Sequence, residues 1–203
     1  MRLGIFGGTF DPVHFGHLSL AEECMSAAAL DEVWFVPAAS PPHKSGKKIS
    51  RFDQRKEMLE LAIAGNEKFK VEPMEADRPG PSFTIDTLEQ IKSQNPSDEI
   101  FLIIGADSAL EFPTWKDPAR ILSIATLVIR VRPSFDIPNE TDFSIQMQKE
   151  IGVKPKLLIV TGLPYFDISG SELRNRVAMG KTIRYLLPRS VEVYTQQKKL
   201  YLS

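Results

Sequence analysis

The chain has 203 residues, of which 42% are hydrophobic and 25% are charged, and its formal net charge is −1. This size and this balance are typical of one soluble domain with a full hydrophobic core, so we expect residues 1–203 to form a single domain. The near-zero charge argues against general binding to nucleic acid or to an anionic membrane, because both attract strongly basic proteins.

Cys24 is the single cysteine, which excludes an intrachain disulfide. It lies in an apolar helical stretch, and this favours a buried core thiol over a catalytic nucleophile. Met1 leads directly into a strand-like segment without the basic and apolar regions of a signal peptide. No uncharged run approaches the ~20 residues that a membrane helix needs. The expected location is therefore the cytoplasm.

Strand-like and helix-like segments alternate along the chain. Short apolar runs indicate strands, and apolar residues spaced three and four apart indicate helices. In chain order the pattern predicts a strand at 3–6, a helix at 15–30, a strand at 33–36, a loop at 38–50, a helix at 51–64, a strand at 69–71, a loop at 75–82, a helix at 84–94, strands at 100–104 and 127–131, a polar insertion at 136–141, a strand at 157–160, and helices at 171–179 and 188–197.

This alternation predicts an α/β fold, a Rossmann-like doubly wound parallel sheet with right-handed crossovers and helices on both faces. The run at 100–104 is apolar throughout, which is typical of a buried parallel strand. In such sheets ligands bind at the carboxyl ends of the strands, near a topological switch point. Functional residues are therefore expected directly after the strands.

Two glycines follow the first strand, and two of the chain's three histidines come soon after them. Gly7 and Gly8 permit unusual backbone angles and let main-chain amides approach a ligand, while the following helix N-terminus favours anions. His14 and His17 are spaced to lie on one side of a helical turn, and Gly16 leaves room for a bulky group. Imidazoles in this position donate hydrogen bonds to phosphate oxygens, and these bonds strengthen as negative charge builds in a transition state.

Three other interpretations compete with a phosphate site at this segment. The histidines could be structural helix residues, and the glycines could serve turn geometry alone. The histidines could also bind a metal, but a zinc site normally has a third protein ligand, and His43 lies in the predicted loop at 38–50. The combination of these residue types in one short segment favours the phosphate site, and we predict no metal held by protein side chains.

The segment Gly7-Gly8-Thr9-Phe10-Asp11-Pro12-Val13-His14-Phe15-Gly16-His17 resembles the signature of the HxGH nucleotidyltransferase superfamily. These enzymes transfer a nucleoside monophosphate from a nucleoside triphosphate to an acceptor phosphate. Later segments make the chain similar to the bacterial nicotinate-nucleotide adenylyltransferase family over nearly its whole length. They lie at 41–44, 83–88, 105–107, 115–117, 168–174 and 180–188.

The resemblance implies an ATP site. From the residues alone, Ser171 and Arg174 lie one helical turn apart, either facing a phosphate or serving as a capping serine and a solvated arginine. Asp107 either accepts from sugar hydroxyls or caps a helix. Gly170 departs from the hydroxyl-rich run that the family often has there. The predicted ATP-binding residues are Gly7, Gly8, Thr9, Phe10, His14, Gly16, His17, Gly105, Asp107, Ile168, Ser171 and Arg174, and the predicted catalytic residues are His14, His17, Ser171 and Arg174.

A second set of residues is assigned by the resemblance to the acceptor nucleotide. In the family a tryptophan at the place of Trp115 packs on the nicotinate ring, while Thr84 and the backbone amide of Lys116 hold the carboxylate. From the sequence alone, Trp115 is equally a core residue, Lys44 a solvated lysine and Arg132 a surface charge. The predicted nicotinate nucleotide-binding residues are Lys44, Thr84, Trp115, Lys116 and Arg132.

The implied reaction transfers AMP from ATP to nicotinate mononucleotide, giving nicotinate adenine dinucleotide and pyrophosphate in NAD biosynthesis, with no enzyme-bound intermediate. We expect Mg²⁺ to arrive with ATP, held mostly by phosphates and water. The expected partners are ATP and nicotinate mononucleotide, without nucleic acid or membrane. The sequence leaves the oligomeric state open, and a homo-oligomer is compatible with it. Nicotinamide mononucleotide or pantetheine phosphate as acceptor, and a catalytically silent nucleotide-binding sensor, are the alternatives.

Overall fold

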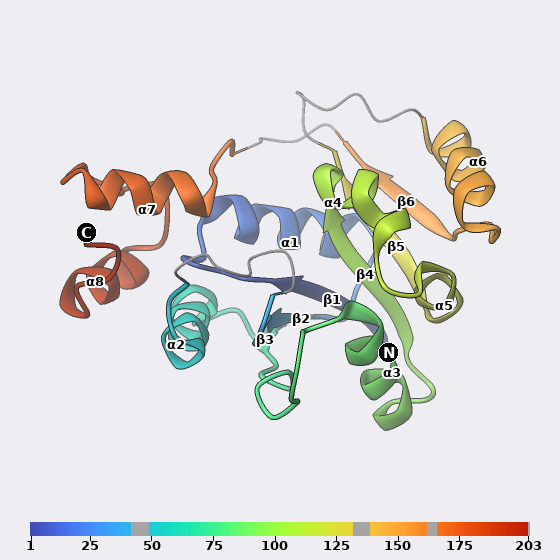
Figure 1. The fold of residues 1–203 in the computed structure, drawn as a ribbon, viewed down its shortest axis with the longest axis horizontal. Coiled ribbons are helices and arrows are strands. Elements are labelled where there is room, and N and C mark those ends of the chain that lie inside the picture. The colour runs from blue at the N-terminus through green and yellow to red at the C-terminus, as the bar shows by residue number, and fades with distance from the viewer. Residues whose placement is uncertain (42–48, 132–138, 162–165, 203) are drawn as a thin grey trace.

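The structure is a computed structural model that describes residues 1–41, 49–131, 139–161 and 166–202. Its centre is a six-stranded sheet in the order β3-β2-β1-β4-β5-β6, with every neighbouring pair parallel (Figure 1). This order reverses between β1 and β4, which makes that boundary the topological switch point. The strands are β1 (Arg2–Gly8), β2 (Glu32–Pro37), β3 (Phe69–Val71), β4 (Glu99–Gly105), β5 (Ala125–Arg130) and β6 (Leu157–Val160).

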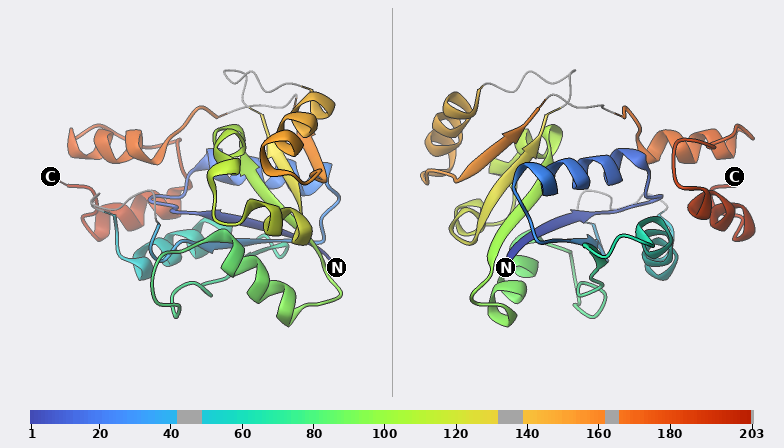
Figure 2. Two further views of the ribbon diagram at one scale, coloured as in Figure 1. Left: turned by 45° about the vertical axis from the view of Figure 1, so that its right-hand side comes forward. Right: turned by 180° about the vertical axis from the view of Figure 1, so that it is seen from behind.

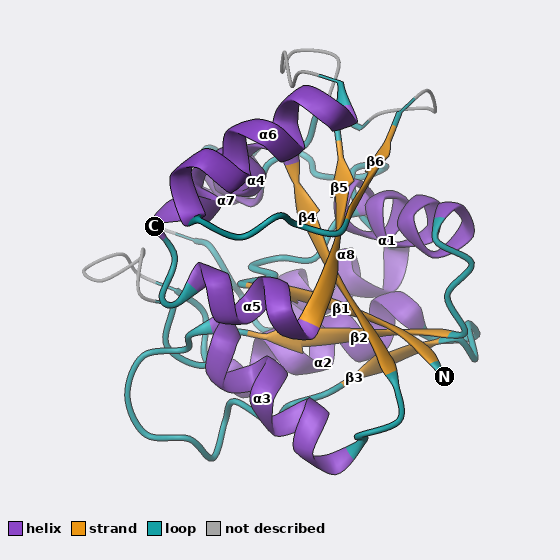
Figure 3. Cartoon of the chain, turned by 90° about the vertical axis from the view of Figure 1, so that its right-hand side faces the viewer, coloured by secondary structure: helices purple, strands orange, loops and turns teal. Residues whose placement is uncertain are grey.

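Eight α-helices and one 3₁₀ helix accompany these strands within the described residues, and the last two helices follow the last strand. The sheet twists strongly, so that β4, β5 and β6 run at a steep angle to β1, β2 and β3 (Figure 3). The helices are α1 (Phe15–Ala27), α2 (Phe52–Ile63), α3 (Thr84–Gln94), α4 (Ala106–Glu111), η2 (Phe112–Thr114), α5 (Pro118–Ile124), α6 (Glu140–Ile151), α7 (Gly170–Ala178) and α8 (Arg189–Gln197).

Alternation along the strands divides the core into two clusters, one on each face of the sheet. In β4, for example, Phe101 and Ile103 belong to one cluster and Leu102 and Ile104 to the other. The first cluster contains buried residues of α1, α2, α7 and α8, and the second those of α3, α5 and α6. Two views of the molecule show α1 on one side of the sheet and α3 on the other (Figure 2). The predicted doubly wound fold is therefore confirmed.

All six predicted strands are present, but three α-helices were not predicted. α6 starts at Glu140, so the polar insertion predicted at 136–141 is wrong for its last two residues, and 136–138 lie outside the described residues. The side chain of Asn139 begins this helix by accepting from the amide of Asp142 at 3.0 Å. The first helix ends at Ala27 rather than at residue 30.

Cys24 is fully buried between α1 and the sheet, and burial raises the pKa of its thiol to about 12. The thiol is therefore protonated at neutral pH, which confirms it as a core residue rather than a nucleophile. Within the described residues, each helix is too short or too polar to cross a membrane.

Candidate active site

The turn after β1 differs from the sequence prediction in two respects. Gly7 and Gly8 are the last residues of β1 and pair with Val36 and Pro37, so the strand is longer than predicted. The left-handed backbone angle falls on Phe10, at φ 50°, and not on either glycine. The ring of Phe10 is buried against His17, with centroids 5.0 Å apart. Packing thus holds this residue in an angle that non-glycine residues seldom adopt.

The two glycines have different roles in this turn. A Cβ atom on Gly8 would lie 2.8 Å from Cζ of Phe10, so Gly8 makes room for the buried ring. A Cβ atom on Gly7 would meet nothing within 4 Å, and Gly7 is exposed. Gly7 therefore leaves open space at the end of β1, where a ligand has direct access to the main chain.

His14 and His17 stack on each other at the start of α1. Their ring centroids are 3.7 Å apart with an interplanar angle of 25°. The main-chain amide of His14 donates to Nδ1 of His17 at 3.3 Å, so the neutral His17 ring carries its proton on Nε2. A Cβ atom on Gly16 would lie 3.0 Å from Nδ1 of His14, so this glycine leaves space for the imidazole.

Both histidines line a cavity of about 310 Å³ at the carboxyl edge of the sheet. Its walls come from the turn after β1, α1, α4, the end of β5 and the start of α7, which lie far apart in the sequence. Gly105 does not line it but ends β4, beside Arg130. The predicted ATP-binding residues that line this cavity are Thr9, Phe10, His14, Gly16, His17, Asp107, Ile168, Ser171 and Arg174.

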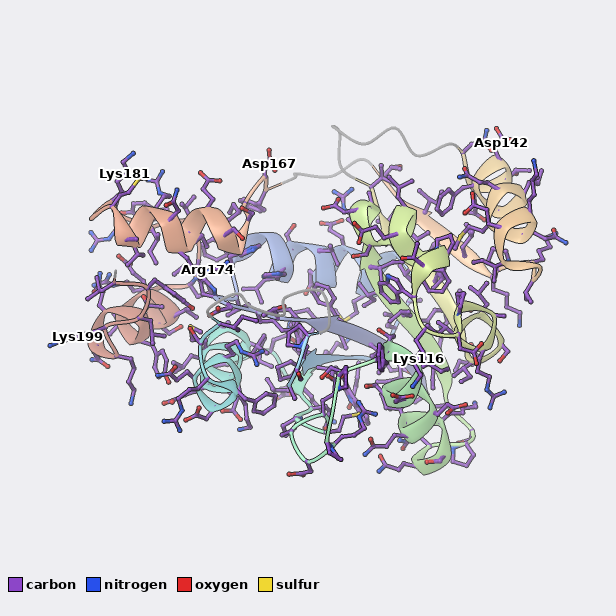
Figure 4. All side chains as sticks on the ribbon, in the orientation of Figure 1. Lys116, Asp142, Asp167, Arg174, Lys181 and Lys199 are labelled. Atoms are coloured by element: carbon purple, nitrogen blue, oxygen red, sulfur yellow. The ribbon has the colours of Figure 1, made fainter. Side chains whose placement is uncertain are left out.

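α7 contributes an arginine that is held from two sides. Arg174 donates from Nη1 to the main-chain oxygen of Asp11 at 2.6 Å and from Nη2 to Oγ of Ser171 at 3.1 Å. The capping serine of α7 is Ser169, which accepts from the amide of Glu172 at 3.2 Å, so the alternative of Ser171 as the cap is wrong. Figure 4 shows Arg174 on the side of α7 that faces β1.

Gly170 allows α7 to approach the turn after β1. A Cβ atom at this position would lie 3.0 Å from the main-chain oxygen of Asp11, which is tighter than an ordinary contact. The departure from the family's hydroxyl-rich run therefore brings the backbone of α7 close to Asp11 and places Arg174 within hydrogen-bonding distance of it.

Asp107 lies in the first turn of α4, whose N-cap is Gly105. The alternative of Asp107 as the helix cap is therefore wrong. Its side chain is exposed and lines the cavity with the histidines.

Two further cavity residues were not predicted from the sequence. Arg130 ends β5, and its side chain is 4% exposed; its Nη1 donates to the main-chain oxygen of Val131 at 2.8 Å. An arginine at the carboxyl end of an apolar strand is a signal that could have been used, but the strand was predicted to continue to residue 131. Phe166 is 43% exposed and follows no recognisable motif. Ser19 and Leu20 of α1 also line the cavity.

A second, smaller cavity of about 90 Å³ lies at the same end of β1, and Gly7, Gly8, Thr84 and Trp115 are among the residues that line it. Thr84 is the first residue of α3. The Trp115 ring is partly buried against Phe112, with centroids 5.3 Å apart. Trp115 is thus both a packing residue and a wall of this cavity.

The side chain of Lys116 turns toward α3 (Figure 4). Its Nζ lies 2.9 Å from Oδ1 of Asp86 and 4.6 Å from the centre of the Phe83 ring. The charge of the Lys116 side chain is therefore paired within the protein. Lys44 and Arg132 lie outside the described residues.

A buried carboxylate that the sequence did not point to borders the second cavity. Glu75 is 6% exposed and accepts from Oγ1 of Thr87 at 2.6 Å. Arg78 lies 3.6 Å from the same carboxylate and neutralises it. This network joins Thr87 of α3 to Glu75 and Arg78. Glu75 and Arg78 both belong to the segment 75–82, which the sequence had indicated only as a loop.

In the part of the chain that the structure describes, no cluster of three or more His, Cys, Asp or Glu residues could hold a metal ion.

Residues 5–176 match the family described as Cytidylyltransferase-like. Two relatives carry the name probable nicotinate-nucleotide adenylyltransferase. That of Geobacillus thermodenitrificans is 41% identical over 200 residues, covering 98% of this chain and 86% of the relative. That of Thermus thermophilus is 40% identical over 201 residues, covering 99% of this chain and 100% of the relative.

A solved structure shares the fold. Plasmodium falciparum nicotinic acid mononucleotide adenylyltransferase complexed with NaAD superposes with a TM-score of 0.80 at 20% identity, covering 98% of this chain and 97% of that one. The doubly wound sheet and the histidine-lined cavity at its switch point define a nucleotidyltransferase. Within that class, the chain belongs to the nicotinate-nucleotide adenylyltransferase family.

Proposed function

We propose that this chain transfers AMP from ATP to nicotinate mononucleotide, forming nicotinate adenine dinucleotide and pyrophosphate in NAD biosynthesis. The names of its relatives supply the substrates. The structural support is that the two cavities adjoin the same stretch of chain. Gly7 and Gly8 line the second cavity, and the residues that follow them, from Thr9 onward, line the first. A donor in the first cavity and an acceptor in the second would meet at the end of β1.

The first cavity would hold the phosphates of ATP. In this proposal His14 and His17 donate to oxygens of the α-phosphate, while Ser171 and Arg174 bind the phosphates that leave. An oxygen of the acceptor phosphate attacks the α-phosphorus in line, and the bond from that phosphorus to the bridging oxygen breaks. Pyrophosphate departs with the electron pair. Such a step depends on positioning and charge stabilisation, and not on a covalent intermediate.

The same cavity would bind the nucleoside part of ATP. Asp107, which is exposed at the start of α4 and lines the cavity, would accept from ribose hydroxyls. Ile168 supplies an apolar wall.

The second cavity would hold the nicotinate ring. Thr84 begins α3, and the helix N-terminus favours a carboxylate there because its first amides have no partner within the helix. The flat face of Trp115 can stack on a pyridine ring. The backbone amide of Lys116 would complete the carboxylate site. Lys44 and Arg132 stay predicted contacts of the acceptor nucleotide.

Mg²⁺ fits the first cavity as an ion that ATP brings with it. Of the described residues that line the cavity, two carry carboxylates, Asp107 and Asp11. The Asp11 carboxylate accepts hydrogen bonds from Ser50 and Tyr201. Such a small donor set suits an ion that keeps phosphate and water ligands, and the bound ion would neutralise charge on the phosphates.

A pyrophosphate-release assay tests the proposal with ATP and three acceptors: nicotinate mononucleotide, nicotinamide mononucleotide and pantetheine phosphate. We expect the highest kcat/KM with nicotinate mononucleotide. A higher value with another acceptor would overturn the substrate assignment. If the protein bound ATP but released no pyrophosphate with any of the three acceptors, it would be a nucleotide-binding sensor.

A further inference from the structure

The C-terminal tail reaches back to the turn that carries the site. Oη of Tyr201 donates to Oδ1 of Asp11 at 2.6 Å, across 190 positions of the sequence. The tail makes this contact with Lys199 at φ 52° and Tyr201 at φ 63°, angles that side-chain-bearing residues seldom adopt. Such angles persist only where the surrounding contacts hold them, so the tail is directed to this position.

Asp11 joins the tail to two other segments of the chain. Its Oδ2 accepts from the amide of Ser50, two residues before α2, at 3.1 Å. Its main-chain oxygen accepts from Nη1 of Arg174 at 2.6 Å. Asp11 is only 4% exposed, so it has little freedom to move once these bonds are made.

A buried arginine holds the same turn from the side of α2. Arg55 is 2% exposed, and its Nη1 donates to the main-chain oxygen of Thr9 at 2.8 Å. Its Nε donates to the oxygen of Ser50 at 3.0 Å. Arg55 therefore fixes the main chain at Thr9 and at Ser50. The tail is bonded to Asp11 through the hydroxyl of Tyr201.

We propose that Tyr201 is a positioning residue: its hydroxyl orients Asp11, and the main-chain oxygen of Asp11 in turn places the Arg174 guanidinium for the phosphates of ATP. This inference rests on the proposed function for the role of Arg174. Tyr201 itself does not line the first cavity and has no contact with the reacting atoms. Burial, together with the charge of Asp11, raises the pKa of the Tyr201 phenol, so it stays protonated and donates.

Tyr201→Phe removes the hydroxyl and keeps the ring, and the chain offers a matched control. Oη of Tyr194 also donates to a carboxylate, Oε2 of Glu57, at 2.7 Å, between α8 and α2 and outside both cavities. The wild type, Tyr201→Phe and Tyr194→Phe are compared by calorimetry with ATP, by steady-state kinetics and by thermal unfolding.

We expect Tyr201→Phe to weaken ATP binding and lower kcat/KM for ATP, each by about tenfold, as for loss of a hydrogen bond to a charged group. The KM for nicotinate mononucleotide stays unchanged, and Tyr194→Phe changes neither nucleotide parameter. A purely structural role would lower the active fraction without moving the dissociation constant of ATP. Unchanged ATP affinity in Tyr201→Phe, or equal losses in the two variants, would overturn the inference.

Asp11→Ala tests the route of the effect, because it removes the acceptor of the Tyr201 hydroxyl and keeps the main-chain oxygen that holds Arg174. If Tyr201 acts through Asp11, adding Tyr201→Phe to Asp11→Ala changes ATP affinity far less than it does in the wild type. Equal effects in both backgrounds overturn the inference. Should Tyr201→Phe alone not fold, Asp11→Ala by itself must show the same split between the two substrates. If the wild type binds ATP but releases no pyrophosphate, the proposed function is overturned. The ATP affinities of the variants still test the positioning role of Tyr201.

Discussion

The two nitrogens of the His17 ring have different roles in the proposed mechanism. Nδ1 accepts from the amide of His14, and Nε2 would donate to phosphate. We expect His17→Ala to lower turnover by about two to three decades, since loss of one such donor costs ~2.7–4 kcal/mol of transition-state stabilisation. Steady-state pyrophosphate release measures the loss, and thermal unfolding checks that the fold is retained. Turnover close to that of the wild type would contradict the catalytic assignment.

Two further substitutions separate the nitrogens of His17. The amide of asparagine extends about as far as Nδ1 of histidine, whereas that of glutamine extends about as far as Nε2. His17→Gln should therefore retain more turnover than His17→Asn, although Asn keeps an acceptor for the amide of His14. Equal turnover in the two variants would contradict the assignment of the acceptor role to Nδ1 and the donor role to Nε2.

The neighbouring glycines should respond differently to the same change. Gly8→Ala forces the Phe10 ring to move, so it should destabilise the protein by ~1–3 kcal/mol. Gly7→Ala meets open space and should unfold like the wild type. If a ligand fills that space, the added methyl group weakens nucleotide binding by roughly tenfold to a hundredfold. Calorimetry and denaturant unfolding of both variants measure the contrast, and normal nucleotide affinity in Gly7→Ala would argue against a ligand at the end of β1.

The cavity residues that spacing alone indicated lie in one continuous motif, whereas Asp107, Ser171 and Arg174 were assigned by the family resemblance. His14, Gly16 and His17 are close in the chain, so their spacing alone indicated a shared site. Arg130 and Phe166 enter the same cavity from segments more than 100 residues away, and only the folded sheet brings them there. The turn was predicted to bind a ligand, and its residues do line the cavity. The residue with the unusual backbone angle was not predicted, because Phe10 is held in that angle by packing and not by its own preference.

At the scale of single elements, α6 and α7 contrast in what their first residues do. Asn139 caps α6 away from both cavities, so Asn139→Ala should cost ~0.5–2 kcal/mol of stability and leave turnover intact. Ser171 accepts from Arg174 and is not a cap, so Ser171→Ala should weaken ATP binding and leave stability almost unchanged. Unfolding curves and ATP titrations of the two variants give the comparison. If Ser171→Ala instead lowered stability and kept its ATP affinity, Ser171 would act as a cap of α7.

Strands were predicted more accurately than helices, and the reason lies in their length and burial. Each strand is a short apolar run, and each ends within about two residues of its predicted position. α4 and α5 have six and seven residues, which is too short for a helical period to show. α6 is longer, but it buries only Phe143 and Met147 and so has a weak apolar pattern.

At the scale of the whole molecule, the strand order places the two cavities on the same edge of the sheet. The first is lined from α1 and α7, which cover one face, and the second from α3, which covers the other. The donor and the acceptor would therefore approach β1 from opposite faces. The alternation of elements predicted a parallel sheet, but it is the same for every strand order, so the position of the switch point could not be read from it.

Contacts between the C-terminal helices and β1 support the prediction of a single domain. α7 and α8 lie at one end of the molecule (Figure 1), yet Leu173, Val191 and Tyr194 share a core cluster with Phe6 of β1. We therefore propose that residues 1–203 unfold as one unit. Calorimetry should show one transition, and ATP at about 100 times its dissociation constant should add ~2.7 kcal/mol and raise the midpoint by roughly 5–11 °C. Two transitions, of which ATP shifts only one, would instead divide the chain into two domains.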